Sequence, residues 1–477
     1  MDATSTRSRV AIILPLMLGT LMSGIDSSIV NVSLPTMRNQ FHCGLDDIEW
    51  VITAYMLGFC IFIPLTNWLK QRIGFYKLYL GSVFVFTAGS LMCGLSTSLT
   101  MLIISRAIQA FGGGAITPTA MAILTTVFPK NERGSIMGWW SLGSITGPAI
   151  GPTLGGLLTE YFGWPSIFMV NIPIGIITII VAAISLRFLQ QEQKLKTNRF
   201  NTFEFTIFTL FIVLLQYAIA KMARVGVTSP AVASSFVLSI IALWVFIRSS
   251  RRNSGPLFDL GVFAHADFVK CMLITLVRSV ALYSGLFLLP FLLQGLLGYS
   301  EIESGLFILP NSIMMAILTP IAGGWSDRHG PRRIVIIGLV MVSISMFMFS
   351  QVDSRIAWYV LLAMSVRGIG MGSLVSPITS TAMNSVDPEQ ATDGSSLYSL
   401  TQQLGGSIGI ALAGLIHQYL YQHYLSGKHF TQQVAEHYAI EDAFLISSFL
   451  VLVALIPAFK LPVLTPDKKN ELVHTEV

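Results

Sequence analysis

Charged residues are scarce in this chain. They make up 11% of its 477 residues, against about 25% in soluble domains, whereas hydrophobic residues make up 53%. Apolar runs of roughly 18–25 residues recur from one end to the other, and each can cross a hydrocarbon core of about 30 Å. The composition therefore excludes a water-soluble globular protein and indicates a membrane protein.

Cysteine is also rare, and no catalytic pattern is present. Cys43, Cys60, Cys93 and Cys271 lack metal-ligand spacing, and three of them lie inside apolar runs as small apolar residues. Four histidines between positions 417 and 437 do not share one helical face. There is no phosphate-binding loop, nucleophile elbow or zinc-type His pair. We expect neither an enzyme nor an ATP-driven pump, and we expect no metal and no cofactor.

The apolar runs predict an all-α protein with fourteen membrane-spanning helices. They cover approximately residues 10–34, 48–68, 77–97, 100–121, 134–158, 165–187, 203–222, 230–248, 267–294, 304–324, 332–350, 356–377, 396–418 and 441–461. The first run continues past Asp26 without a small-residue cleavage signature, so it is interpreted as a retained span. With both termini inside, most of the 29 Lys and Arg residues fall on the cytoplasmic side. The net charge of +5 thus reflects topology in the cell (inner) membrane and does not indicate a nucleic-acid partner.

Span 5 contains the most unusual stretch, GSITGPAIGPTLGG. Glycines follow one another at a step of four residues, at Gly143, Gly147, Gly151 and Gly155, and Pro148 and Pro152 take the same step on the adjacent face, with Gly156 at the end. Small residues at this spacing form a flat ridge that lets two backbones approach closely. A tightly packed membrane helix is one interpretation. The rest of the chain favours the other, a bent helix at the interface between two halves of a transporter.

Ionisable residues inside the membrane mark functional sites by default. Asp26 lies roughly 24 Å from the cytoplasmic edge and Arg106 roughly 9 Å below the outer surface, at about 1.5 Å per residue, so their depths are similar. Because an unpaired Arg in lipid is costly, we expect a partner for Arg106. Gln109 shares the helical face of Arg106. We assign proton coupling to Asp26 and Arg106.

Two more arginines lie within predicted spans, Arg278 in span 9 and Arg367 in span 12. Arg278 is near the middle of the membrane, where snorkelling is difficult, so we expect it to line an aqueous cavity. The substrate cavity is predicted to include Asn31, Gln109, Arg278 and Arg367.

Two pairs of features indicate an internal repeat. Gly330 follows Gly74 by 256 residues, in similar basic turns, and Arg367 follows Arg106 by 261 residues. Such repeats are typical of secondary transporters. We predict an N-terminal six-helix half at 1–189, a cytoplasmic linker with two inserted helices at 190–266, and a C-terminal six-helix half with a short polar tail at 267–477. The turn motifs comprise Gln71, Arg72, Gly74, Asp327, Arg328, Gly330 and Arg333.

These motifs together resemble those of the major facilitator superfamily, and within it the fourteen-span drug:proton antiporters. The span 5 stretch is similar to the group's antiporter motif, IDSSIVNVSLP (25–35) to its span 1 signature, and SRAIQAFGGG (105–114) to its span 4 motif. GGWSDRHGPRR (323–333) is similar to the superfamily's loop motif. The resemblance implies two six-helix halves plus two inserted helices.

The chain departs from the family pattern at several positions. In the first loop copy Asn67 replaces a Gly and Gln71 replaces an Asp, whereas the second copy keeps Asp327. The acid of the family's cytoplasmic latch is therefore missing from the N-terminal half. Ala110 replaces a Gly in span 4, and residues 164–166 read Trp-Pro-Ser where the family has two aromatics around an Arg.

The sequence predicts a proton-coupled exporter of small amphipathic compounds that works by alternating access, with protons and the lipid bilayer as its other partners. Two rivals stay open: the same fold exporting a specific metabolite, siderophore or lipid, and a non-transporting membrane sensor. The resemblance does not name the substrate or a periplasmic adaptor.

Overall fold

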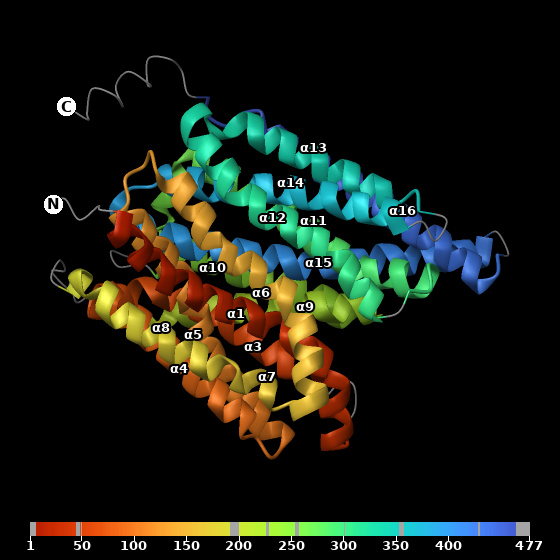
Figure 1. The fold of residues 1–477 in the computed structure, drawn as a ribbon, viewed down its shortest axis with the longest axis horizontal. Helices are drawn as coiled ribbons and strands as arrows, with labels where there is room; N and C mark the ends of the chain where they lie inside the picture. The colour runs from red at the N-terminus through yellow and green to blue at the C-terminus, as the bar shows by residue number, and fades with distance from the viewer. Residues whose placement is uncertain are drawn as a thin grey trace. The chain divides into compact units, whose positions relative to one another are not determined.

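The structure, a computed structural model, describes residues 6–43, 48, 50–190, 200–225, 229–252, 257–299, 301–352, 357–427 and 430–463. Every regular element within these ranges is helical (Figure 1). The longer helices are α1 (Thr6–Phe41), α3 (Trp50–Phe62), α4 (Leu65–Gly94), α5 (Leu99–Val127), α6 (Arg133–Phe162), α8 (Asn171–Ser185), α9 (Thr202–Val225), α10 (Pro230–Ser250), α11 (Ala266–Pro290), α12 (Glu301–His329), α13 (Pro331–Phe349), α14 (Ala357–Asn384), α15 (Ala391–Gly427) and α16 (Gln432–Leu452). Short helical turns are α7 (Ser166–Met169), η1 (Arg187–Gln190), η2 (Leu260–Ala264), η3 (Phe291–Leu296), η4 (Pro388–Gln390) and α17 (Leu455–Ala458).

Eleven segments of the described helices are long and apolar enough to cross a membrane. The three remaining predicted spans, 48–68, 134–158 and 396–418, fall mainly on α3, α6 and α15. Helix α3 has only 13 residues. Helices α6 and α15 are longer, but they are rich in Gly, Ser and, in α15, Gln, which lower their hydropathy. The eleven segments and these three helices together occupy the fourteen predicted positions.

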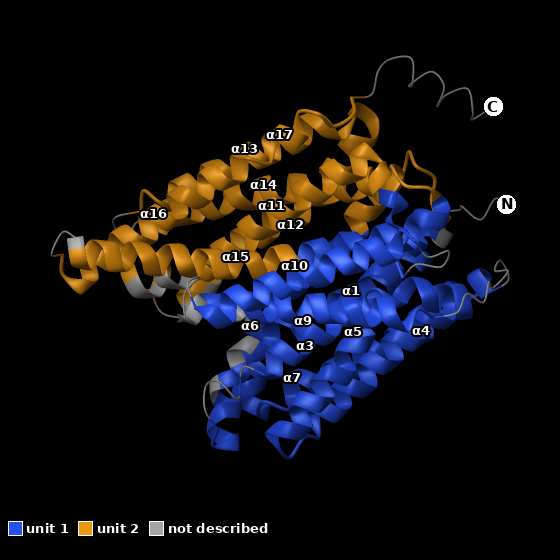
Figure 2. Cartoon of the chain, turned by 180° about the vertical axis from the view of Figure 1, so that it is seen from behind, with its two compact units in different colours: residues 1–126, 140–262, 388–403 blue, residues 127–139, 263–387, 404–477 orange. Residues whose placement is uncertain are grey.

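The chain divides into two compact units, each considered by itself (Figure 2). Unit 1 comprises residues 1–126, 140–262 and 388–403, and unit 2 comprises residues 127–139, 263–387 and 404–477. The first residues of α6 are thus grouped with unit 2, and the first residues of α15 with unit 1. The predicted linker begins with a polar segment, most of which (191–199) lies outside the described residues. The predicted division at 189 and 266 stays a prediction.

Close helix packing in each unit depends on small residues. In unit 1, α1 and α4 both contact α8, and α9 contacts α10; in unit 2, α14 contacts both α12 and α13. Gly112 of α5 shows why glycine is needed, because a Cβ there would lie 2.4 Å from the backbone nitrogen of Phe86 in α4. This is the close backbone approach that small residues permit between membrane helices.

The two basic turns share one backbone conformation. Gly74, at a kink inside α4, has φ 81° and ψ 164°, and Gly330, just before α13, has φ 83° and ψ 157°. Positive φ is unfavourable for residues with a Cβ, so both positions suit glycine. The matching geometry supports the internal repeat that the 256-residue spacing predicts.

Candidate functional site

A buried ion pair lies in unit 1. Arg106 of α5 donates from Nη1 to Oδ2 of Asp26 in α1 at 2.6 Å. The relative exposure of the two side chains is 1% and 0%. The structure therefore brings together the two residues for which the sequence predicts a common depth, and it identifies Asp26 as the partner of Arg106.

Neutral polar side chains complete a cage around Asp26. Gln109 of α5 donates from Nε2 to Asp26 Oδ1 at 2.8 Å, and Asn171 of α8 donates from Nδ2 to the same oxygen at 3.1 Å. Both amides also donate to the Ser90 hydroxyl of α4, at 2.7 and 3.3 Å. The Oε1 atom of Gln109 accepts a second bond from Arg106 Nη1 at 2.6 Å. Four helices thus supply one fully buried hydrogen-bond network.

The guanidinium of Arg106 is held from its other sides as well. Its Nε donates to the carbonyl of Val51 in α3 at 3.1 Å. Its Cζ lies 4.1 Å from the centroid of the Tyr55 ring and 5.6 Å from that of Phe168, which is the geometry of a cation–π contact. These contacts fix the position of the charge, so a change at Asp26 alters the surroundings of a cation that cannot itself lose its proton.

The predicted substrate-cavity residues have different surroundings. Gln109 is fully buried in the cage, and its place in a substrate cavity stays a prediction. Arg278 and Arg367 in unit 2 are buried too, at 2% and 1% exposure, where α14 packs against α11 and α12, and their place in a substrate cavity stays a prediction. Asn31 lies in α1, but its side chain is outside the described part of the structure.

Sequence reasoning missed Ser90, Asn171 and Tyr55. Single hydroxyl and amide residues recur in most of the spans, so nothing in the pattern distinguishes Ser90 or Asn171 from the others. Their role depends on which helices meet at Asp26, and that is a property of the tertiary structure.

The glycine ridge of α6 lies against α1, within unit 1. A Cβ at Gly147 would lie 2.7 Å from the backbone of Gly24 and Ile25, and one at Gly143 would lie 2.5 Å from the carbonyl of Met17. Added Cβ atoms at Gly151 and Gly155 would meet Ser28 and Ile29 of α1. By contrast, nothing lies within 4 Å of a Cβ built at Gly156, which is therefore off the ridge. The side chain of Pro148 is exposed, and that of Pro152 lies outside the described part.

The acid of the second loop copy caps a helix in unit 2. Asp327, near the end of α12, accepts hydrogen bonds from the backbone N–H groups of Gly134 at 3.0 Å and Ser135 at 2.9 Å. These residues begin α6, where unpaired N–H groups and the helix dipole favour a negative charge. The exposed Arg328 and Arg333 lie beside this contact in the sequence.

We expect Asp327→Asn to slow transport several-fold and to lower thermal stability. Hydrogen bonds to a charged acceptor contribute about 1.5–3 kcal/mol, and the amide retains only one acceptor oxygen for the two N–H groups. Transport into vesicles and thermal unfolding of the purified protein would measure both effects. Asp387→Asn, at an exposed acid of the same unit, is the matched control. Equal behaviour of the two variants would contradict the capping role.

The first loop copy in α4 has Gln71 in place of an acid, and the carboxylate next to this turn belongs to Asp393 of α15. Asn67 of α4, at the position that corresponds to Gly323, donates from Nδ2 to Asp393 Oδ2 at 2.8 Å, within unit 1. Thr66 and Ser396 share a second hydrogen bond across the same pair of helices at 2.7 Å. Gln71 Nε2 lies 3.5 Å from Asn67 Oδ1, and Arg72 stacks on Trp68. The replacement of Gly by Asn at position 67 thus has a structural consequence that the sequence does not reveal.

Because the carboxyl group of Asp393 is buried, we expect the stability of the folded protein to depend on pH. Burial is the main reason that the pKa of Asp393 is raised from 3.8 to about 7. The charge of Asp259 acts in the same direction, whereas a hydrogen bond with the Asp259 backbone, the charge of Lys70 and the Asn67 amide oppose the rise. Between pH 4 and 7 the folded protein therefore retains a proton that the unfolded chain loses, so stability decreases as pH rises through this range and levels off above it. In Asp393→Asn this dependence should disappear. Unfolding temperatures of the variant and the unmodified protein, measured from pH 5 to 8, should diverge as pH rises; parallel curves would contradict the assignment.

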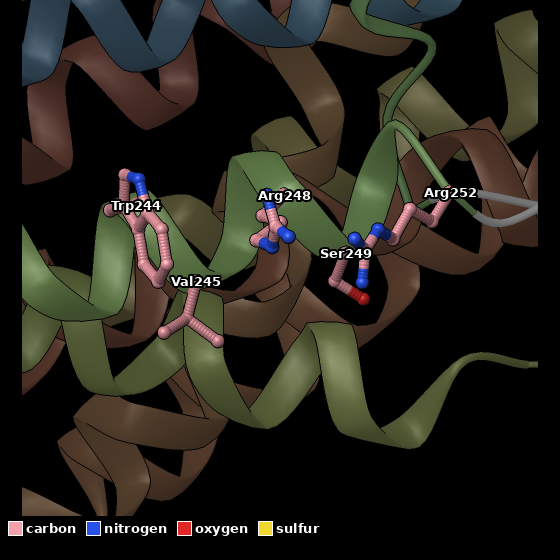
Figure 3. A pocket seen from close by; sticks show the side chains of 5 residues that line it. All are labelled: Trp244, Val245, Arg248, Ser249 and Arg252. Carbon is pink, nitrogen blue, oxygen red and sulfur yellow. The ribbon is translucent and has the colours of Figure 1, made fainter.

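A surface groove on α10 does not resemble a transport site. Figure 3 shows its lining side chains, Trp244, Val245, Arg248, Ser249 and Arg252, which all come from α10 and the turn after it. Arg248 lies over the Trp244 ring at 5.6 Å, and both side chains are exposed. A groove on the outer face of one helix cannot enclose a substrate, so we assign no role to it.

Comparison with known proteins agrees with the fold and the motifs. The family model described as "Major Facilitator Superfamily" matches residues 16–410. The chain is 32% identical over 414 residues to the "Uncharacterized MFS-type transporter YhcA" of Bacillus subtilis (strain 168), covering 87% of this chain and 77% of that one. It is 32% identical over 415 residues to the "Multidrug resistance protein B homolog" of Mycobacterium tuberculosis (strain ATCC 25618 / H37Rv), with coverage of 85% and 76%.

A further relative is the "Multidrug export protein EmrB" of Escherichia coli (strain K12), 30% identical over 406 residues, with coverage of 83% of this chain and 78% of that one. Among solved structures, that of the human organic anion transporter MFSD10 superposes with a TM-score of 0.66 at 14% identity, covering 94% of this chain and 99% of that one, which supports the fold alone. The chain is a multi-pass membrane transporter and not an enzyme, and it belongs to the major facilitator superfamily, among relatives that are multidrug transporters.

Proposed function

We propose that this protein is a proton-coupled antiporter that exports small amphipathic compounds by alternating access. The observation that carries the proposal is the buried Asp26–Arg106 pair. An ionisable pair at this depth is costly to maintain in a membrane protein and marks ion or substrate pathways. The names of the multidrug relatives favour export of several compounds over a single substrate.

The network around Asp26 supports the coupling step. When Asp26 is ionised, it accepts from Arg106, Gln109 and Asn171. Protonation removes the negative charge that pairs with Arg106, which weakens the attachment of α1 to α5. The Asn171 Oδ1 atom has no hydrogen-bond partner among the described residues, so this amide can rotate and accept from the protonated carboxyl. The two protonation states can therefore favour different helix arrangements.

Export of one native metabolite, siderophore or lipid on the same fold is the alternative function. The apolar spans favour a substrate with a large apolar part in either case. We place both termini in the cytoplasm, because this orientation gives the cytoplasmic segments most of the Lys and Arg residues, and we place the chain in the cell (inner) membrane.

A transport assay in everted membrane vesicles tests the proposal. A panel of amphipathic compounds is offered with an imposed pH gradient and again after the gradient is abolished. We expect uptake of several compounds that depends on the gradient, together with proton release from the vesicle lumen. Gradient-independent uptake would refute the proton coupling, and uptake of a single compound would favour the alternative.

A further inference from the structure

Unit 2 contains two buried arginines that differ from Arg106 in their surroundings. Arg278 lies in α11 and Arg367 in α14, with 2% and 1% exposure, and both are among the largest fully buried side chains. In unit 1 the buried Arg106 is neutralised by Asp26. Within the described part of unit 2, no carboxylate forms an ion pair with Arg278 or Arg367.

Their hydrogen-bonding groups are largely unused. The Nε and Nη2 atoms of Arg278 and the Nε atom of Arg367 have no partner among the described residues. Arg367 Nη2 donates to the carbonyl of Leu282 in α11 at 2.7 Å. Leu282 follows Arg278 by four residues, about one helical turn, so Arg367 binds α11 one turn away from the backbone position of Arg278.

A third polar group lies on the same side of α11. Thr275 precedes Arg278 by three residues, a spacing that places two side chains on one helical face. Its hydroxyl is buried and also lacks a partner in the described part of the chain. A hydroxyl on the same helical face as Arg278 can add a donor for the same ligand.

A guanidinium does not escape burial by losing its proton near neutral pH. Each buried N–H without a partner is destabilising, and an uncompensated buried charge is more so. Such a cluster is relieved when an anion enters it. Carboxylate, sulfonate and phosphate groups match the planar fork of Arg donors, which can bind them through two parallel hydrogen bonds.

We propose that Arg278 and Arg367, with Thr275, form an anion subsite that binds the acidic group of an amphipathic substrate, a carboxylate or a sulfonate. This proposal rests on the proposed export function and specifies its substrate class. The side chains are buried in the present conformation, so the subsite becomes accessible when the transport cycle opens unit 2. A binding measurement at equilibrium can detect the subsite even so, because it includes every conformation of the protein that accepts the ligand.

The test uses a matched pair of fluorescent probes and the purified full-length protein in detergent. Dansyl-glycine carries a carboxylate, and dansyl-glycinamide is its neutral counterpart of nearly equal size. We expect the protein to bind dansyl-glycine at least about tenfold more tightly. Arg278→Gln and Arg367→Gln should each weaken dansyl-glycine binding about tenfold or more, the range typical of lost charged hydrogen bonds, and leave dansyl-glycinamide binding unchanged.

Two further variants distinguish the effect of positive charge at this site from the effect of positive charge elsewhere on the protein. Arg278→Lys keeps the positive charge, so it should retain a preference for dansyl-glycine, though a weaker one than Arg because it loses the fork geometry. Arg248→Gln removes an exposed cation from α10 and should leave the preference intact. Elution profile and unfolding temperature of each variant would establish that it is folded.

Equal affinity of the unmodified protein for the two probes, or failure to bind dansyl-glycine, would overturn the subsite. An equal loss of preference in Arg248→Gln would do the same. The vesicle assay distinguishes failure of the anion subsite from failure of the proposed export function. Gradient-driven transport without discrimination between the probes would remove the anion subsite and leave the export function standing. Discrimination without gradient-driven transport would remove the coupling and leave the subsite.

Discussion

Replacing Asp26 with Asn should abolish efflux driven by a pH gradient while leaving the protein in the membrane. The amide cannot carry a proton, so the coupling step proposed for the Asp26–Arg106 pair is lost. The polar contacts can largely persist, since the new side chain still offers one oxygen to Gln109 and Asn171. Downhill movement of substrate, measured without a gradient in the same vesicles, should continue.

The variant also leaves Arg106 without its counter-ion, and that effect must be separated from lost coupling. Breaking a buried pair by removing one partner typically costs about 3–5 kcal/mol, enough to unfold a marginal protein. The double variant Asp26→Asn with Arg106→Gln removes both charges and should recover stability without recovering coupling. Asp26→Glu keeps a titratable group and should retain part of the gradient dependence, with a shifted pH profile.

The readout is the ratio of gradient-driven to downhill transport for each variant. Under our hypothesis the ratio falls to the no-gradient value in Asp26→Asn and in the double variant. Wild-type ratios in Asp26→Asn would assign the coupling proton to another residue. Recovery of coupling in the double variant would show that the ion pair has only a structural role.

The sequence was sufficient to place Asp26 and Arg106 at a similar depth and to require a partner for Arg106, because charges in apolar spans are rare. Few other charged residues lie at a similar depth, so Arg106 has few possible partners. The family motifs that contain Asp26 and Arg106 also assign both residues to functional segments. Ser90 and Asn171 could not be predicted, since hydroxyl and amide side chains occur in most of the spans. Their proximity to Asp26 arises from the packing of α4 and α8 around α1, which local patterns do not encode.

The same distinction applies elsewhere in the chain. The four-residue step of glycines predicted a close helix contact, but α1 as its partner emerged only from the tertiary structure. The position of Arg278 and Arg367 inside spans was readable, whereas their burial was not, because exposure depends on the conformation. The contact between Asn67 and Asp393 joins residues 326 positions apart and has no counterpart in either local motif.

A side chain on the glycine ridge of α6 should stop transport without preventing folding. A Cβ at Gly147 would lie 2.7 Å from backbone atoms of α1, which cannot rotate away, so the two helices must separate. Overpacking of this kind typically costs about 1–3 kcal/mol. The inward and outward states of a carrier differ by only a few kcal/mol, so their populations would change several-fold to a hundred-fold. We expect Gly147→Val to insert, to bind substrate and to fail in translocation.

The structure also ranks the ridge positions. At Gly151 the nearest obstacle is the Ser28 hydroxyl, which can change rotamer, so Gly151→Ala should impair transport less than Gly147→Ala.

The remaining variants of α6 complete the set. Pro148→Ala should express normally and, by straightening α6, alter the exchange between the inward and outward states. Gly156→Ala is the matched control, because the added methyl meets nothing, and Leu157→Val is a second control at an exposed position. Substrate binding and transport should be measured side by side for the whole set. If the ridge variants lose insertion and binding together, the glycines serve ordinary packing; if Gly156→Ala is as impaired as Gly147→Ala, contact with α1 is not the cause.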